Sequence, residues 1–145
     1  MHRGGFLVAR EHTEAGRLAN SRAALATGHT YWVIPDGYIP PDSRGSLESH
    51  ESICVLNTGR EEAVLDITIF FEDREPIENI EASVPGRRTR HIRTASLHAG
   101  EQSIPSGVPY AITVSSNVPV IIQYSRLDTT QPELALMSVM AFPLT

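Results

Sequence analysis

Short runs of apolar residues separated by turn residues fill most of the chain after His29. Residues 63–73 show the clearest pattern, because apolar and polar side chains alternate there with a period of two. The apolar positions are Leu65, Ile67, Ile69 and Phe71, and the polar positions between them include Asp66, Thr68 and Glu72. This alternation predicts a strand with one face in the core and the other in water.

Other runs are rich in Val, Ile, Thr and aromatic residues and end at Pro, Gly, Asn or Asp. They read TYWVI (30–34), SICVLN (52–57), ENIEASVP (78–85), TRHIRT (89–94), YAITVSS (110–116), VPVIIQYSRL (118–127) and LALMSVMAFP (134–143). We expect the first run to end at Pro35 and residues 36–46 to form a loop. Many short strands with closely spaced turn signals predict an all-β, single-domain antiparallel β-sandwich over residues 29–145.

The last of these runs could instead be a helix, since Leu, Ala and Met favour helices. We interpret it as a strand because it ends in Val139, Phe142 and Pro143. Residues 1–28 differ from the rest and are rich in Ala, Arg and Glu, with apolar residues at roughly helical spacing. We predict that this N-terminal extension is a short helix or disordered and ends at Gly28.

Composition describes an ordinary globular protein with a net charge of −5 over 145 residues. All twelve basic residues are arginines. Cys54 is the only cysteine, so no intramolecular disulfide can form, which fits a reducing cytoplasm. No apolar run approaches the length of a bilayer span, so we expect a soluble cytoplasmic protein without membrane insertion.

A dense group of cations interrupts this acidic chain between Val84 and Leu97. If residues 89–93 form a strand, Arg88 and Arg90 share one face, and His91 and Arg93 share the other. Their partners could be acidic residues nearby in the sequence, a nucleic-acid backbone, or the carboxylates of another subunit or protein. The nearby acidic residues are Glu72, Asp73, Glu75, Glu78 and Glu81. We predict that the arginine stretch lines a subunit or partner surface and pairs with carboxylates.

No catalytic, metal or cofactor motif is present. The histidines lack the spacing of a zinc site, although His50 and His91 could still converge in space. Cys54 lies in an apolar run and is better explained as a buried side chain than as a nucleophile. We therefore expect no enzymatic activity, no cofactor and no metal site.

Polar residues also mark the apolar segment 116–128. A buried Gln123 should hydrogen-bond across the sheet or to Arg126, because buried polar groups need partners. Arg126 and Asp128 share a strand face and could pair with another strand, with His91 and Arg93 as candidate neighbours. A network of Gln123, Arg126 and Asp128 would either fix the register of the strands or form the polar base of a binding pocket.

Five segments together resemble the sensory rhodopsin transducer family. They are GYIPP (37–41), SHESICVLN (49–57), ITIFFEDREP (67–76), VPGRRTRHIR (84–93) and SNVPVIIQYSRLD (116–128). They occur in the same order and at similar spacing, and the similarity spans residues 31–142. The resemblance implies a small soluble β-sandwich that assembles as a homotetramer, similar in fold to sugar-binding sandwiches. Its founding member is taken to relay light signals from a membrane photoreceptor to the cytoplasm, and interaction with DNA has been proposed.

Three functions fit these observations. The first is a cytoplasmic signalling adaptor that acts through protein–protein contacts as a homo-oligomer, with a membrane photoreceptor or another sensor as partner. The second is a binding module for a carbohydrate or metal, and the third, a weaker alternative, is a DNA-binding regulator. The candidate ligand- or partner-binding residues are His50, Glu51, Arg87, Arg88, Arg90, His91, Arg93, Gln123, Arg126 and Asp128.

Overall fold

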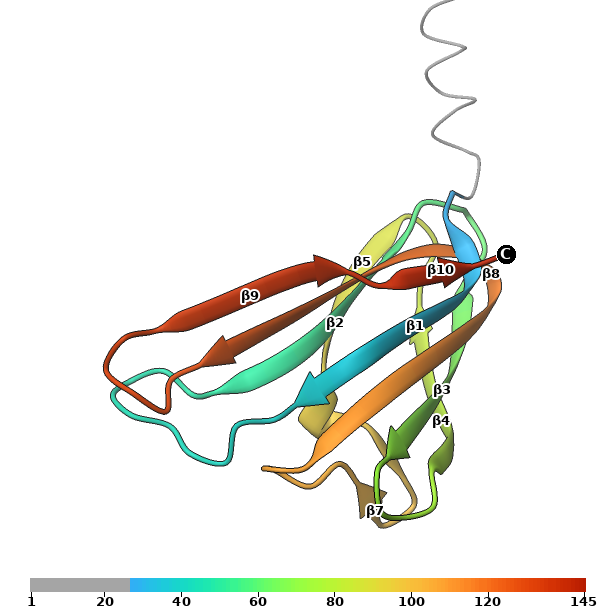
Figure 1. Cartoon of the computed structure of the whole chain (residues 1–145). Coiled ribbons are helices and arrows are strands. Elements are labelled where there is room, and N and C mark those ends of the chain that lie inside the picture. Colours follow the sequence, from blue (N-terminus) through green and yellow to red (C-terminus); the bar gives the residue numbers. More distant parts are fainter. Residues whose placement is uncertain (1–26) are drawn as a thin grey trace, which may run out of the picture.

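The computed structural model describes residues 27–145, which form an all-β fold of antiparallel strands (Figure 1). The predicted fold class is confirmed, whereas the predicted helix or disorder over residues 1–28 lies almost wholly outside the described residues. The strands are β1 (His29–Tyr38), β2 (His50–Asn57), β3 (Ala63–Phe71), β4 (Ile77–Val84), β5 (Arg88–Arg93), β6 (His98–Ala99), β7 (Gln102–Ser103), β8 (Pro109–Asp128), β9 (Ala135–Met140) and β10 (Phe142–Leu144), with one 3₁₀ turn, η1 (Thr94–Ser96), between β5 and β6.

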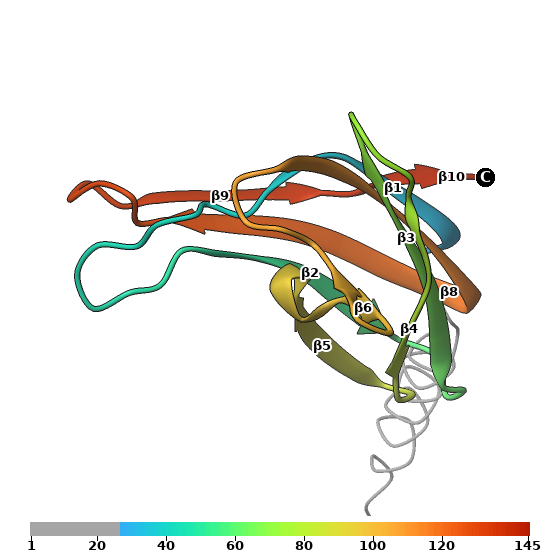
Figure 2. The ribbon, with the colours of Figure 1, turned by 90° about the horizontal axis from the view of Figure 1, so that it is seen from below.

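Strand β8 belongs to both layers of the sandwich. Its first half pairs with β1 and β3, and its second half pairs with β2 and β9. β10 extends the first layer beyond β1, β4 extends it beyond β3, and β5 forms the margin of the second layer beyond β2. Figure 2 shows the two layers diverging from β8.

The sequence predicted two strands where β8 is continuous, and the difference comes from a bend at residues 116–119. His29 lies opposite Val120 and Tyr31 opposite Ser115, so β8 advances five residues while β1 advances two. The extra residues include Pro119, which cannot donate a backbone hydrogen bond to a neighbouring strand. The turn-like composition of this segment therefore marks the corner at which β8 passes from one layer to the other.

The predicted end of the first strand at Pro35 is also wrong, because β1 continues to Tyr38. Its register with β8 shifts between Ile34 and Gly37. The space around Gly37 explains the residue type, since a Cβ there would lie 2.6 Å from the ring of Tyr110. The strand therefore continues beyond Pro35 by means of this register shift, and Gly37 and Tyr38 pair with β8.

The core follows from the alternation of side chains along each strand. Leu65, Ile67 and Ile69 of β3 are fully buried, and Asp66 between them is exposed, as the pattern predicted. Residues of β1, β2, β4, β5 and β8 join them in one contiguous apolar cluster, which includes Trp32 and also contains Ile39, Leu97, Ile104 and Ala141 from outside the strands. The Trp32 indole nitrogen donates to the His29 carbonyl at 3.0 Å, so its polar group is satisfied within the core.

Two turns at one end of the sandwich are joined by the buried side chain of Asn57. Its amide nitrogen donates to the carbonyls of Glu61 and Val84, and its amide oxygen accepts from the Gly59 N–H. The Arg87 N–H donates to the Gly59 carbonyl at 2.8 Å. The turn after β2 therefore fixes the place at which β5 begins.

The C-terminal strands settle the choice between helix and strand in favour of strand. β9 pairs with β8 and β10 pairs with β1. All six residues of β9 are exposed. Within residues 27–145, no helix has the length and apolarity needed to span a bilayer.

Candidate functional site

A buried carboxylate lies where β1, β2 and β8 meet. Glu51 is the second residue of β2, on the inward face that it shares with Ile53 and Val55, and only 1% of it is exposed. Its oxygens accept from the Tyr38 backbone N–H at 2.8 Å and from the hydroxyls of Tyr110 and Tyr124. With so many donors, the Glu51 charge is satisfied inside the core.

Arg126 neutralises this carboxylate. The β2–β8 register places Arg126 directly opposite Glu51, and its Nε donates to Glu51 Oε1 at 2.7 Å. The guanidinium also donates to the Tyr124 hydroxyl at 3.2 Å and lies 3.7 Å from the exposed carboxylate of Asp36. A charge network therefore runs from the core to the surface beside β1.

The network shifts the pKa of its members. Burial, together with the neighbouring Glu51 carboxylate, raises the pKa of Tyr110 and of Tyr124 well above the ordinary tyrosine value. Burial disfavours the Arg126 cation, but hydrogen bonds to Glu51 and Tyr124 outweigh this and raise its pKa. Because Glu51 already accepts four hydrogen bonds, we interpret it as a structural anchor and not as a general base.

Part of this network could be predicted from the sequence. Glu51 and Arg126 were both candidates but were not paired with each other. The candidate neighbours of Arg126, His91 and Arg93, lie on the far side of β2. The two tyrosines were missed. Tyr124 could have been found, since it lies two residues before Arg126 and so shares its face.

The remaining polar residues of β8 have local roles. Gln123 is exposed, not buried, and its side chain hydrogen-bonds across the sheet to Ser138 of β9 and not to Arg126. Asp128 accepts from the backbone and the hydroxyl of Thr130, and these hydrogen bonds lower its pKa. Both therefore fix the β8–β9 hairpin.

The predicted cation cluster is exposed along β5. Arg88, Arg90, His91 and Arg93 are all exposed, and Ile92 is the one buried residue of the strand. Of the three possible kinds of partner, the nearby acidic residues do not pair with this strand within the described part of the chain, where no carboxylate lies within ion-pair distance of these arginines or of Arg87. Pairing with the carboxylates of another subunit or protein stays a prediction.

The arginines of this strand instead donate to backbone carbonyls. Arg90 donates to Ser83 of β4 at 2.7 Å, and Arg88 donates to Arg87 at 2.9 Å. Arg87 itself lies in the turn before β5, with a φ of 57°. The Arg90 side chain therefore bridges the open margin between the two layers.

The histidines do not converge into a ligand site. His50 contacts the Glu48 carbonyl, and His91 lies opposite Cys54 on the outer face of the second layer. Cys54 is half-buried on that face, so it is less buried than predicted. His50, Arg88 and His91 therefore lie apart from the Glu51–Arg126 network, and among residues 27–145 no three His, Cys, Asp or Glu side chains are grouped as a metal site.

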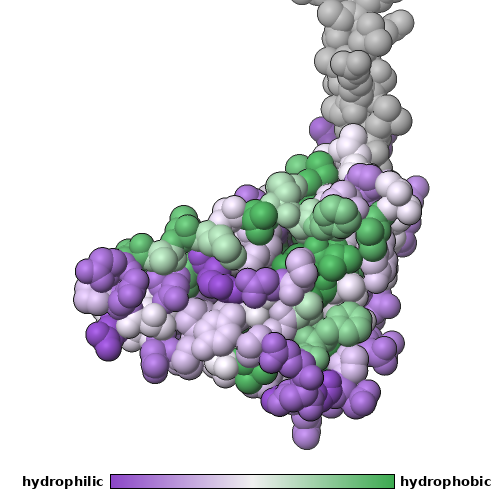
Figure 3. Space-filling model, viewed as in Figure 1, coloured by the Kyte–Doolittle hydropathy of each residue, from purple (hydrophilic) through white to green (hydrophobic). Residues whose placement is uncertain are grey.

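A second surface feature, which was not predicted from the sequence, is an apolar margin along β9 and β10. Seven of the twelve exposed large apolar residues in the described chain lie here: Leu134, Leu136, Met137, Val139, Met140, Phe142 and Leu144. Leu136 is 75% exposed and Phe142 is 64% exposed. Figure 3 shows the apolar surface following these strands. Exposed apolar patches of this kind mark interaction sites.

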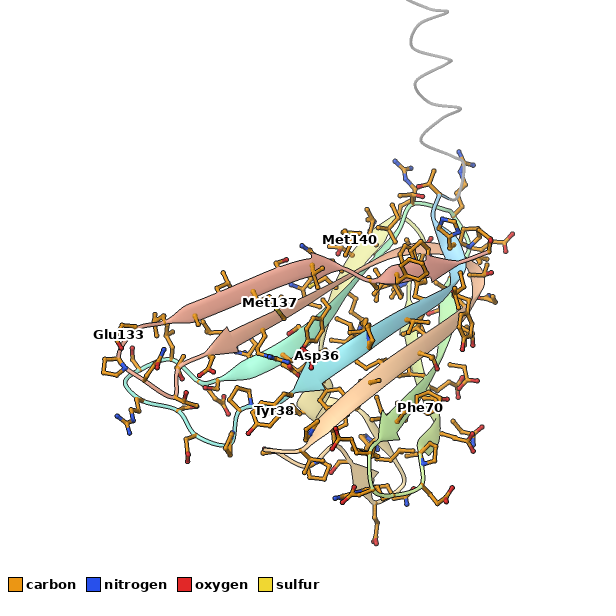
Figure 4. All side chains as sticks on the ribbon, in the orientation of Figure 1. Asp36, Tyr38, Phe70, Glu133, Met137 and Met140 are labelled. Atoms are coloured by element: carbon orange, nitrogen blue, oxygen red, sulfur yellow. The ribbon has the colours of Figure 1, made fainter. Side chains whose placement is uncertain are left out.

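Between β9 and β1 the same margin is hollowed into a groove of about 340 Å³. Met137, Val139 and Met140 line one side, and Asp36 lines the other. Figure 4 shows Met137 and Met140 on β9 and Asp36 on the facing part of β1. Tyr124 also lines the groove, so the groove abuts the Glu51 network.

Comparisons with known proteins show a family and similar folds for this chain. The family model described as Anabaena sensory rhodopsin transducer matches residues 27–143. A Thermotoga maritima protein of known crystal structure is 40% identical, with a TM-score of 0.72, over 81% of this chain and 97% of its own. The structure of the Anabaena sensory rhodopsin transducer is also 40% identical, with a TM-score of 0.63, over 70% of this chain and 97% of its own. No curated protein matches the chain.

Proposed function

The chain belongs to the Anabaena sensory rhodopsin transducer family, and from this membership we propose that it is a soluble cytoplasmic signalling transducer that acts through protein–protein contacts. The upstream partner would be a membrane photoreceptor or another sensor that exposes a binding surface to the cytoplasm. Neither the family nor the all-β fold points to an enzymatic activity.

One observation carries the proposal: the arginines of β5 are exposed and have no carboxylate partner in residues 27–145. Arginine forms paired hydrogen bonds with carboxylates, so an uncompensated row of arginines suits an acidic partner. A net charge of −5 makes this strand an exception on the molecule, which favours a local docking role over general attraction to nucleic acid.

We propose that the protein also assembles with copies of itself, as a homotetramer, through the apolar margin of β9 and β10. Apolar side chains project from both faces of β9, and its second edge forms no strand pairing within the described residues. Exposed apolar edge strands promote association. This surface and the arginine strand are separate, so assembly and partner docking can be tested separately.

The test is affinity capture from a lysate, followed by cross-linking and mass spectrometry to locate the contact. The variant Arg88→Gln/Arg93→Gln removes two charges from β5, and Arg44→Gln/Arg74→Gln removes the same charge from exposed positions elsewhere. We expect the first variant to lose the partner and the β5 cross-links, and the control to keep both. If both variants captured the partner equally well, the result would contradict the proposed docking site.

A further inference from the structure

One edge of β5 carries free backbone groups. The strand pairs with β2 from Arg88 to Arg93, and it is the last strand of its layer. Within residues 27–145, its other edge forms no backbone hydrogen bond to another element. The Arg90 side chain approaches β4 here and donates to Ser83, and the Ser96 hydroxyl donates to the Arg93 carbonyl at 2.7 Å, so the free backbone groups of this edge lie before Arg93. Such an edge can accept an extended segment as an additional strand.

Positive charge is present on both faces of this edge strand. Arg88 and Arg90 point toward the face that contains Ile92, and His91 and Arg93 point toward the outer face. Successive side chains of an added strand would also point to the two faces in turn. Acidic residues on both faces of the added strand would therefore place carboxylates beside the arginines on each face of β5. An apolar segment would cover the arginines without offering them partners, which is unfavourable.

We propose that β5 accepts an extended acidic segment of the partner protein as an added strand, with Asp or Glu side chains on both faces of that strand paired to arginines on both faces of β5. The inference rests on the proposed function, because it specifies how the docking surface binds. Arg90 holds the margin of the sandwich through Ser83, so Arg88 and Arg93 are the side chains that pair with the ligand.

The test uses the full chain and a fluorescent eight-residue peptide, Thr-Glu-Asp-Val-Glu-Asp-Val-Thr, with binding followed by anisotropy. Two further peptides have backbone N-methyl groups at the odd or at the even positions, which remove the hydrogen-bond donors of one edge and leave every charge in place. We expect saturable binding of the parent peptide. One methylated peptide should bind roughly tenfold more weakly, because its donors face β5, and the other should bind like the parent.

The protein variants supply the matched control. Arg88→Gln/Arg93→Gln should weaken parent-peptide binding by about tenfold, and Arg44→Gln/Arg74→Gln should leave it nearly unchanged. Two methylated peptides that both bind as tightly as the parent would show charge attraction without strand addition and overturn the inference. Tighter binding of a DNA duplex at equal charge concentration would also overturn it, as would a loss of oligomer mass in the β5 variant.

Failure of this inference is distinguishable from failure of the proposed function. If the acidic peptide binds no better than a Gln/Asn version, but capture of the cellular partner still requires Arg88 and Arg93, the docking site stands and strand addition is wrong. If capture is also independent of these arginines, both proposals are wrong.

Discussion

Among single residues, Glu51 makes the hydrogen bonds that hold β1, β2 and β8 together where they meet. A carboxylate in an apolar core is tolerated only when it is paired and fully hydrogen-bonded. The backbone of β1, two tyrosines and Arg126 supply those bonds, and they come from three separate parts of the chain. Glu51 of β2 is thereby hydrogen-bonded to both β1 and β8. β1 and β8 contribute residues to the groove, and β8 pairs with β9.

Replacement of Glu51 by Gln tests this role. The variant removes the charge that Arg126 and the tyrosines face, and we expect it to lower the free energy of unfolding by roughly 3 kcal/mol. Urea denaturation followed by tryptophan fluorescence measures the change through the buried Trp32. Glu78→Gln, at an exposed position of β4, is the control and should change stability by less than about 0.5 kcal/mol. Equal effects at the two sites would contradict the anchor role.

Alkaline pH provides a second test at this scale. The pKa of Tyr110 and of Tyr124 is raised in the folded state, so above pH 10 the unfolded chain loses these protons while the folded chain keeps them. The contribution of these tyrosines to the free energy of unfolding is therefore fully present below about pH 10. It falls as pH rises further, by up to about 1.4 kcal/mol per pH unit for each tyrosine. Urea titrations between pH 9 and pH 12 measure this slope. Tyr124→Phe should make it shallower, and an unchanged slope would count against the network.

At the scale of elements, β5 owes its position to two turns packed against each other. Asn57 and the Arg87 N–H link the turn after β2 to the turn before β5. Gly86 allows the close approach, since a Cβ there would lie 2.0 Å from the Arg60 carbonyl oxygen. The hydrogen bonds between the two turns thus fix the position at which β5 and its arginines begin.

Gly86→Ala should therefore force the two turns apart. We expect a loss of about 1–3 kcal/mol in unfolding free energy and faster amide hydrogen exchange along β5. Gly100→Asn is the control, because Asn tolerates the φ of 59° at that position and its Cβ would meet no atom within 4 Å. Exchange in β5 that is as slow in the Ala variant as in the native protein would show that the turns do not position the strand.

At the scale of the whole molecule, the two unpaired margins differ in chemistry. The β5 margin is cationic, whereas the β9–β10 margin is apolar. Charged edges resist pairing with ordinary strands, and apolar edges promote it. We therefore assign assembly to β9 and β10 and partner docking to β5.

Substitutions in β9 test the assembly surface. Leu136→Glu/Val139→Glu would place carboxylates on both faces of the strand, and burying them between copies would be unfavourable. Light scattering should show the mass falling from that of the oligomer toward 15.9 kDa, the mass of one chain. Leu47→Glu/Leu56→Glu changes charge equally at exposed positions outside this margin and should keep the oligomer mass. An undiminished mass in the β9 variant would exclude this surface from assembly.

Local periodicity and turn residues were enough to predict the fold class, most strands and the exposed arginine stretch, because these features depend on residues close together in the chain. The alternation in β3 and the strand character of 135–140 needed no knowledge of distant residues. The resemblance of five ordered segments also identified the family, which the comparisons confirmed.

Three features could be seen only in the folded molecule: β8 is one bent strand shared by two layers, Glu51 faces Arg126, and β9 is an exposed apolar edge. Each of these depends on cross-strand register and on which edges find partners. A pattern with a period of two shows which side chains share a face of a strand. It does not show which strand lies opposite, and so it cannot distinguish a buried partner from an open edge.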